Sequence, residues 1–222
     1  MPKLVWDQSG EKLYEAGIDH CVFYPQASNG TYTGGVAWNG ITSVSETPDG
    51  GDDNDFYADN IKYGSLRGTE NIGGSIEAYM SPPEFDAVDG SLAVATGVYI
   101  KQQARKTFGL SYRTMIGNDV DGLEHGYKLH LIYGASVSPS DKSYETINES
   151  PDAQSLSWDY TTTPVPVTGV TGARPTSLLI IDSTKVDSTK LAALEDELYG
   201  TDGQNGKTAR LPLPDEVITM LS

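Results

Sequence analysis

The chain has 222 residues and a mass of 23.8 kDa, and its 31 acidic and 15 basic residues give a formal net charge of −16 at pH 7. Tight binding to DNA requires clustered Lys and Arg that neutralise phosphates, so this charge excludes a static DNA-binding protein. Because 37% of the residues are hydrophobic, the chain can form a packed core, which excludes a disordered protein.

Short β-strands joined by turns are expected along most of the chain, because 24 Gly and 12 Pro residues are distributed throughout it. In one of these segments Ile76, Ala78 and Met80 alternate with polar residues, which predicts a strand with one buried face. In another, Trp158 and Tyr160 occupy the inward positions of a similar alternation. The predicted strands cover residues 18–24, 36–44, 73–80, 107–116, 126–134, 155–162 and 176–181.

The clearest pattern is an antiparallel hairpin formed by residues 107–116 and 126–134. Apolar and polar residues alternate in both segments. The intervening residues 117–124 are rich in Gly, Asn and Asp, as is typical of a turn. Two adjacent antiparallel strands are therefore predicted here.

One amphipathic helix is predicted over residues 189–199. Its leucines recur at helical spacing, Asp187 or Ser188 can serve as the N-cap, and Gly200 follows the end. A shorter helix is expected to begin at Ser81, where a capping box is combined with proline at the first helical position. Together the elements predict a mainly β (α+β) fold, a β-sandwich or barrel with one amphipathic helix packed on it, in a single domain spanning residues 1–222.

Three features bear on the compartment in which the chain folds. The single cysteine, Cys21, cannot form a disulfide within the chain, which indicates a reducing cytoplasm. No apolar stretch follows the first charge of the N-terminal segment, so we expect no signal peptide. The longest strongly apolar run, residues 178–181, is far too short to cross a membrane.

The sequence contains no motif that predicts catalysis or ligand binding. The sequence has no nucleophile elbow, P-loop or dinucleotide fingerprint. His125 and His130 are five residues apart, which places them on opposite faces of one strand and prevents joint chelation of a metal. Cys21 lies among apolar residues and is expected to be a buried small hydrophobe. We therefore predict no catalytic residue, no metal site and no cofactor.

The segment 46–55 is dense in carboxylates and in this respect resembles a calcium-binding loop, and the acidic stretch between the predicted strands extends to Asp59. Counted from Asp52, however, Tyr57 stands where such a loop needs glycine and Tyr63 where it needs a bidentate glutamate. Three interpretations remain: a solvated loop between strands, a weak ion site, or a loop used in assembly.

Several strings of residues, spread over nearly the whole chain, match a known family. They are residues 73–79 (GGSIEAY), 83–85 (PEF), 89–91 (DGS), 97–103 (GVYIKQQ), 108–114 (FGLSYRT), 126–134 (GYKLHLIYG), 143–148 (SYETIN), 158–164 (WDYTTTP), 181–185 (IDSTK) and 211–217 (LPLPDEV). With these strings the chain resembles the major tail tube protein of long-tailed (siphovirus-type) bacteriophages, especially those of Gram-positive hosts. Some members of this family carry an additional immunoglobulin-like domain, and we expect none here.

The resemblance implies a structural virion protein and no enzyme. Members of the family form hexameric rings that stack into a hollow tail tube, and genomic DNA passes through the tube during ejection. The implied partners are other copies of the chain, a tape measure protein, and tail terminator and initiator proteins. The implied location is the virion tail, after synthesis in the cytoplasm of the host bacterium. The acidic composition suits a conduit, because a negatively charged wall does not hold DNA.

Assembly requires attractive contacts between subunits, and two sets of residues are candidates. Edge strands carry unpaired N–H and C=O groups that a closed ring of joined sheets would satisfy, and we expect the 107–116 and 126–134 hairpin to contribute, with one face on the core and the other toward the channel or a neighbour. The candidates for ring stacking are acidic residues of the predicted loop: Asp49, Asp52, Asp53 and Asp55. The candidates for contacts between subunits are basic residues: Arg105, Lys106 and Arg113.

Two alternatives stay open at the level of sequence. One is the tube of a phage-derived tail-like particle, which the residues do not separate from a phage tail. The other is a carbohydrate-binding β-sandwich, in which Trp38, Trp158 or the many tyrosines would stack on sugars.

Overall fold

In the computed structural model of the protein, which describes residues 3–144, 146–147, 149, 153–203 and 206–222, most strands join one large antiparallel sheet. The spatial order is β3-β1-β10-β11-β12-β7-β4, and β13 pairs with β11 off this path. Residues 145 and 148, within one of the strings that carry the resemblance, lie outside the described residues. The strands are β1 (Tyr14–Pro25), β3 (Val36–Ala37), β4 (Ile41–Gly50), β7 (Glu70–Ala78), β10 (Phe108–Asn118), β11 (Gly122–Val137), β12 (Leu156–Thr162) and β13 (Leu178–Asp182).

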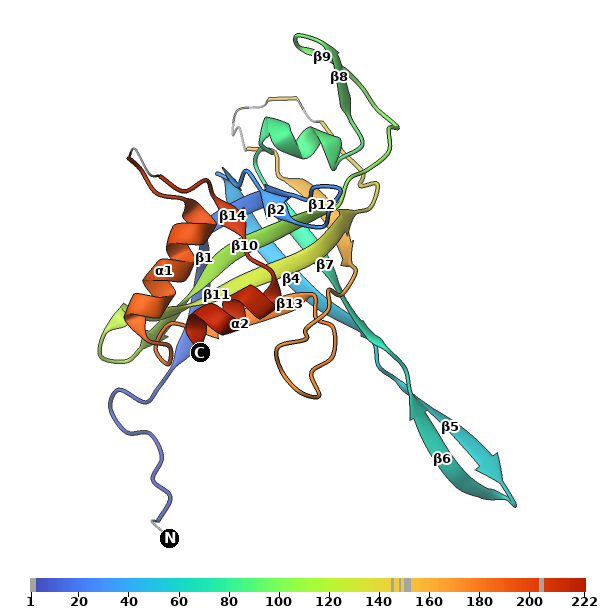
Figure 1. Ribbon diagram of the computed structural model, residues 1–222, viewed down its shortest axis with the longest axis vertical. Coiled ribbons are helices and arrows are strands. Elements are labelled where there is room, and N and C mark those ends of the chain that lie inside the picture. The colour runs from blue at the N-terminus through green and yellow to red at the C-terminus, as the bar shows by residue number, and fades with distance from the viewer. Residues whose placement is uncertain (1–2, 145, 148, 150–152, 204–205) are drawn as a thin grey trace.

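The sheet bends at β11 and closes on itself as a sandwich. β11 pairs with β13 over Lys128–Ile132 and with β12 over Ala135–Val137. Gly134 lies between the two stretches with a φ of 60°, and a Cβ there would stand 2.3 Å from the carbonyl oxygen of Thr163, so only glycine fits. The bend brings β12, β7 and β4 to face β1 and β10 (Figure 1).

The core of the sandwich is aromatic and is shared by both halves of the sheet. Phe23 of β1, Trp38 and Trp158 of β12 all contact Phe85, with ring centroids 4.6–5.5 Å apart. The predicted inward orientation of Trp158 is confirmed, because its side chain has no exposed surface. The buried members of this core are Cys21, Phe23, Trp38, Ile76, Ala78, Phe85, Val88, Phe108, Leu110, Tyr112, Ile132, Ala135, Val137, Trp158 and Tyr160.

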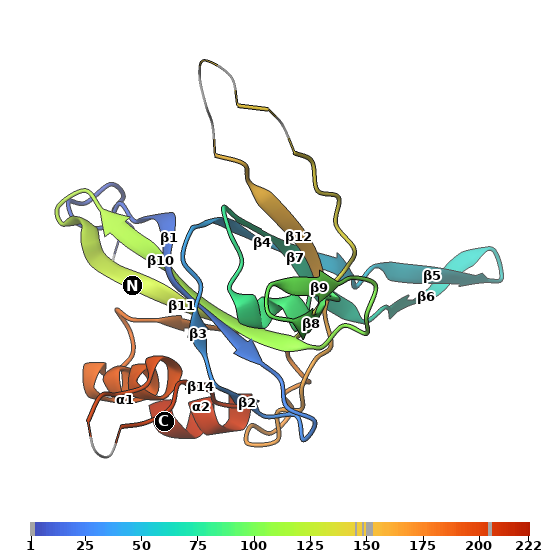
Figure 2. The same ribbon diagram turned by 90° about the horizontal axis from the view of Figure 1, so that it is seen from above.

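A second core lies on the outer face of β10 and β11, beneath two helices, α1 (Ser188–Tyr199) and α2 (Pro214–Leu221) (Figure 2). Alternate residues of β11 point to opposite sides, so Leu129 and Leu131 pack under the helices while Ile132 packs in the sandwich. The buried members are Val22, Tyr24, Tyr32, Leu129, Leu131, Tyr133, Ile181, Leu191, Leu194, Leu198, Leu211 and Val217. The prediction of a mainly β fold with a packed helix is confirmed.

The predicted hairpin corresponds to β10 and β11, but the expected exposure of one face was wrong. The strands pair antiparallel, with Ser111 opposite Leu131 and Arg113 opposite Leu129. One face lines the sandwich, and α1 and α2 cover much of the other. Within one subunit, therefore, this face of the hairpin does not turn toward a channel or a neighbour.

Helix α1 matches its prediction, whereas α2 was not predicted. Asp187 caps α1 by accepting from the N–H groups of Thr189 and Lys190 at 3.0 and 3.1 Å. Helix α2 begins at Pro214, in the first-turn position that proline favours. The helix expected from Ser81 is a 3₁₀ turn, η1 (Pro83–Ala87), without a side-chain cap.

The boundaries of some strands differ from the predicted ones. The predicted strand 36–44 is divided into β3 and β4, and Met80, expected on a buried face, lies beyond β7 and is exposed. The remaining strands form small pairs: β2 (Tyr32–Thr33) with β14 (Arg210–Leu211), β5 (Asp53–Ala58) with β6 (Ile61–Arg67), and β8 (Leu92–Ala95) with β9 (Val98–Ile100).

Candidate assembly surfaces

A two-stranded arm projects from the body where a loop was predicted. The β4–β7 pair continues to Gly50 opposite Glu70, and β5 and β6 then extend it far from the sandwich (Figures 1 and 2). We call residues 49–70 the arm. The loop prediction for 46–59 was wrong because the β-forming residues between the carboxylates form strands. Asp59 and Asn60, with φ of 53° and 64°, form the tight turn at the tip.

Large apolar side chains of the arm are exposed to solvent. Within the arm, Phe56 and Tyr63 contact each other with ring centroids 5.9 Å apart, yet Tyr63 keeps 70% of its surface exposed. A two-stranded hairpin has marginal stability in water on its own, and an apolar surface of this kind marks an interaction site. The exposed apolar residues are Phe56, Tyr57, Ile61, Tyr63 and Leu66.

The four acidic candidates for stacking all belong to the arm or its base. Asp49 is on β4, Asp52 lies between the strands, and Asp53 and Asp55 are on β5. Asp55 accepts a hydrogen bond from Lys62 at 2.7 Å, and this contact, with one from Ser65, lowers its pKa.

The other acidic residues of the arm are less compensated. Arg67 is 4.0 Å from Asp53. Within the described part of the chain, neither Asp52 nor Asp59 has an ion-pair partner. The arm therefore presents uncompensated negative charge to any surface that it contacts.

A second hairpin, formed by β8 and β9, lies at the other end of the long axis of the molecule (Figure 1). All residues of both strands are exposed. As on the arm, the surface is apolar and has no cover within the subunit. The large exposed side chains are Leu92, Val94, Val98, Tyr99 and Ile100.

Both edges of the large sheet offer pairing positions. On its outer side β1 pairs with β3 only at Val22 and Phe23, so among the described residues the stretch 14–20 has no strand beside it there. At the opposite edge, β4 pairs with β7 alone. Free edges of this kind are templates for a strand of another chain.

The three basic candidates occupy different environments. Arg105 and Lys106 are exposed just before β10, and no carboxylate of the described residues lies within ion-pairing distance of them. Arg113 is mostly buried and donates to both carboxylate oxygens of Asp19 at 2.9 and 3.1 Å. Its guanidinium also lies 4.6 Å from the ring centre of Tyr127. Contacts within the chain account for the charge of Arg113, and its contact with another subunit stays a prediction.

A polar cluster that the sequence did not reveal closes one open end of the sandwich. Nδ1 of His130 donates to Glu46 at 2.8 Å, and the phenol of Tyr112 donates to the same carboxylate. The rings of Tyr112 and His130 are stacked, with centroids 4.7 Å apart. The cluster thus fixes the base of the arm, on β4, to β10 and β11.

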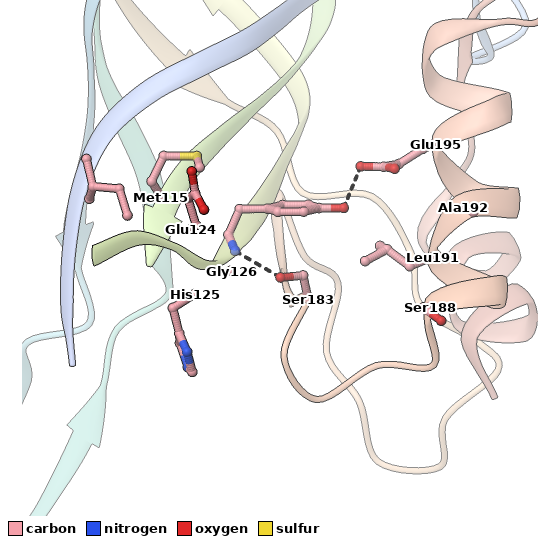
Figure 3. A pocket seen from close by; sticks show the side chains of 11 residues that line it. Met115, Glu124, His125, Gly126, Ser183, Ser188, Leu191, Ala192 and Glu195 are labelled. Carbon is pink, nitrogen blue, oxygen red and sulfur yellow. Dashed lines mark hydrogen bonds between the residues drawn. The ribbon is translucent and has the colours of Figure 1, made fainter. Parts of the chain in front are cut away.

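A cleft of about 380 Å³ lies between the end of the β10–β11 hairpin and α1 (Figure 3). There the N–H of Tyr127 donates to Oγ of Ser183 at 2.9 Å, and the phenol of Tyr127 donates to Glu195 at 2.8 Å. Burial and Glu195 raise the pKa of Tyr127 to about 12, so it stays protonated. His125 contacts Asp121 and Asn118. Among the described hydrogen bonds, none joins Ser183 to His125 as a nucleophile–base pair would require.

The cysteine and the two histidines considered above lie in separate environments within the fold. Cys21 is buried and free, and burial raises its pKa, in agreement with the predicted hydrophobic role. His125 and His130 lie in separate polar clusters. The described residues contain no group of three or more His, Cys, Asp or Glu that could hold a metal ion, and none of their helices is long and apolar enough to cross a membrane.

Comparison with known proteins gives no identification: no protein-family model and no curated protein matches this sequence.

Proposed function

We propose that this protein is a structural subunit that assembles with copies of itself into a tube, as the major tail tube proteins that it resembles do. The observation that carries the proposal is the pair of exposed apolar hairpins, the arm and β8–β9, at opposite ends of one subunit. A contact between unlike surfaces repeats from copy to copy, and when the surfaces lie at opposite ends, so that no rotation closes a ring, it produces a filament.

The free sheet edges support lateral association in the same assembly. If residues 14–20 of one copy lie beside β4 of the next, the sheets join and the unpaired backbone groups of both edges are satisfied. In a ring every edge is then covered. The formal charge of −16 per subunit makes the wall of such a tube acidic, so that DNA could pass without being held. The tape measure, terminator and initiator proteins of a phage tail are the further partners of this proposal.

Two other functions are less well supported. A tail-like particle derived from a phage would use the same surfaces. A carbohydrate-binding role would lose Trp38 and Trp158 as stacking surfaces, because these side chains are 3% and 0% exposed, and would depend on exposed tyrosines instead.

Removal of the arm tests the proposal. Joining Gly51 directly to Gly68 leaves a Gly-Gly-Thr turn between Gly50 and Glu70, which are already paired. The shortened protein should keep its sandwich, since the arm contributes no residue to either core, and should form no tubes in electron micrographs at concentrations where the intact chain does.

A second variant tests whether assembly needs the exposed apolar side chains of the arm as well as its length. Replacing Tyr57 and Tyr63 by Ser keeps the arm but removes two exposed rings, and it should raise the concentration needed for assembly. Tyr144→Ser is the control, because Tyr144 is even more exposed than these two tyrosines and lies outside both hairpins. An intact chain that stays monomeric at every concentration and with virion partners present would refute the proposed function.

A further inference from the structure

A cleft of about 530 Å³ lies beside the β8–β9 hairpin and is lined by cations. Its walls come from three segments: the turn after η1, the connection between β9 and β10, and the residues after β11. The backbone fixes these segments together, because Gln103 donates its N–H to Gly90 at 3.0 Å and Lys106 to Ala87 at 3.2 Å. The lining residues are Asp89, Lys101, Gln102, Gln103, Arg105, Pro139, Ser140 and Lys142.

The charge of the cleft is positive in a strongly acidic protein. Lys101 and Lys142 both donate to the carboxylate of Asp89, at 2.9 and 3.0 Å. Burial opposes the ionisation of Asp89, but the two lysines outweigh it and lower its pKa, so one negative charge faces two positive ones. Arg105 adds a third cation without an ion-pair partner among the described residues. The cleft therefore retains an excess of positive charge.

The arm has the complementary character. Its tip carries Asp59, uncompensated by any cation of the described residues, and the exposed Tyr57 and Ile61 flank that tip. The cleft is likewise flanked by exposed apolar residues, since β9 ends at Ile100, next to Lys101. Charge would thus meet opposite charge, and apolar surface would meet apolar surface.

The tip and the cleft cannot meet within one subunit. The segments that form the cleft lie beside β8–β9, at the opposite end of the long axis from the tip of the arm (Figure 1), and β5 alone, with 6 residues at about 3.3 Å per residue, spans roughly 20 Å. A second copy, displaced along that axis, brings its tip to the cleft of the first.

We propose that the cationic cleft receives the tip of the arm of another copy of this chain, with Asp59 facing Lys101, Arg105 and Lys142. This inference rests on the proposed function, because it names the receptor for the arm in a head-to-tail assembly. The contact is heterologous and leaves a free tip at one end and a free cleft at the other, so it sets the direction of growth.

Charge reversal tests the contact. Asp59→Asn keeps a residue that tolerates the left-handed turn and removes the charge, so it should raise the critical concentration for assembly several-fold. Asp59→Lys and Arg105→Glu should each raise it by about tenfold or more. The double variant should return it to within about threefold of the wild-type value, because each reversed charge again meets an opposite one.

Two matched controls distinguish a specific contact from a general effect of charge. Lys185→Glu reverses an exposed charge that does not line the cleft, and Asp196→Lys reverses an exposed charge on α1. Both should assemble nearly as the wild type does. Equal effects of Lys185→Glu and Arg105→Glu, or the absence of recovery in the double variant, would overturn the inference.

Cross-linking gives a second readout that does not depend on charge. Cysteines at Ile61, beside the tip, and at Gln103, in the cleft, should be joined by a short bismaleimide into a ladder of dimers and longer chains. Cys21 does not interfere because it is buried. Either single variant should give no ladder, and failure of the double variant to cross-link in assembled material would count against the contact. If the wild type never assembles, the proposed function fails; if it assembles and Asp59→Lys assembles equally well, only this inference fails.

Discussion

Nδ1 of His130 on β11 lies 2.8 Å from the carboxylate of Glu46 on β4, and this hydrogen bond joins the two halves of the sandwich at its open end. Burial alone would raise the pKa of Glu46, but the hydrogen bonds from His130 and Tyr112 outweigh it, and the pKa falls below the ordinary value of 4.5. A carboxyl group whose pKa is lower in the folded than in the unfolded protein stabilises the fold at pH values above its unfolded pKa. This stabilisation is lost as the pH falls through the pKa of the folded protein.

Glu46→Gln should therefore lower the free energy of unfolding by about 1–3 kcal/mol at pH 7, because the neutral amide is a weaker acceptor for both donors. The difference from the wild type should shrink as the pH falls below 4.5. Denaturant titration at several pH values measures it. Glu11→Gln, at an exposed position, is the control, and a difference that stays constant between acid and neutral pH would contradict the assignment.

Much of the fold could be predicted from local sequence patterns. The alternation around Phe108 and Leu131 and the signals at Asp187 and Gly200 are set by neighbouring residues, so β10, β11 and α1 could be predicted. Helix α2 has only two turns after a Leu-Pro-Leu-Pro string, too little for periodicity to be recognised.

The surfaces that carry the proposals depend on contacts between distant residues. Arg113 and Asp19 are 94 positions apart, and Glu46 and His130 are 84 apart, so spacing in the sequence could not pair them. The arm was not predicted for a different reason. Its strands are rich in acidic residues, which indicated a loop, although the β-forming residues Phe56, Tyr57 and Tyr63 lie between them. The cleft brings together three separate segments, and its charge appears only when they are adjacent.

The N-cap of α1 should make a measurable contribution to stability. Asp187→Ala removes the acceptor for the N–H groups of Thr189 and Lys190 and should lower the free energy of unfolding by about 1 kcal/mol. Asp196→Ala makes the same chemical change at an exposed position near the other end of the helix, where a negative charge is unfavourable, so it should be neutral or slightly stabilising. Equal losses in the two variants would show that Asp187 does not act as a cap.

Cys21 should report on opening of the sandwich. Its thiol is buried and its pKa is raised by burial, so the reactive thiolate is scarce and shielded in the folded protein. A thiol reagent should modify it at the rate of unfolding, several orders of magnitude more slowly than it modifies the chain in denaturant. The signal is unambiguous because the chain contains 1 cysteine. Rapid modification under native conditions would show that the edge at β1 opens readily.

Variants of Arg113 and Asp19 can distinguish a role in the stability of the subunit from a role in contact between subunits. Burial opposes the ionisation of Asp19, but hydrogen bonds from Arg113 outweigh it and lower the pKa of Asp19. Arg113→Ala should lower the free energy of unfolding of the isolated subunit by about 1–3 kcal/mol, and Arg113→Lys by less, because lysine keeps the charge but neither the paired hydrogen bonds nor the stacking on Tyr127.

Combining Arg113→Ala with Asp19→Asn should give less than the sum of the two losses, with a coupling of at least about 0.5 kcal/mol. Arg105→Ala is the control, since Arg105 is exposed and should leave the stability of the subunit unchanged. If Arg113→Ala instead leaves the subunit as stable as the wild type and impairs only assembly, the residue acts between subunits, as expected from the sequence. Measuring unfolding and assembly on the same preparations decides between the two roles.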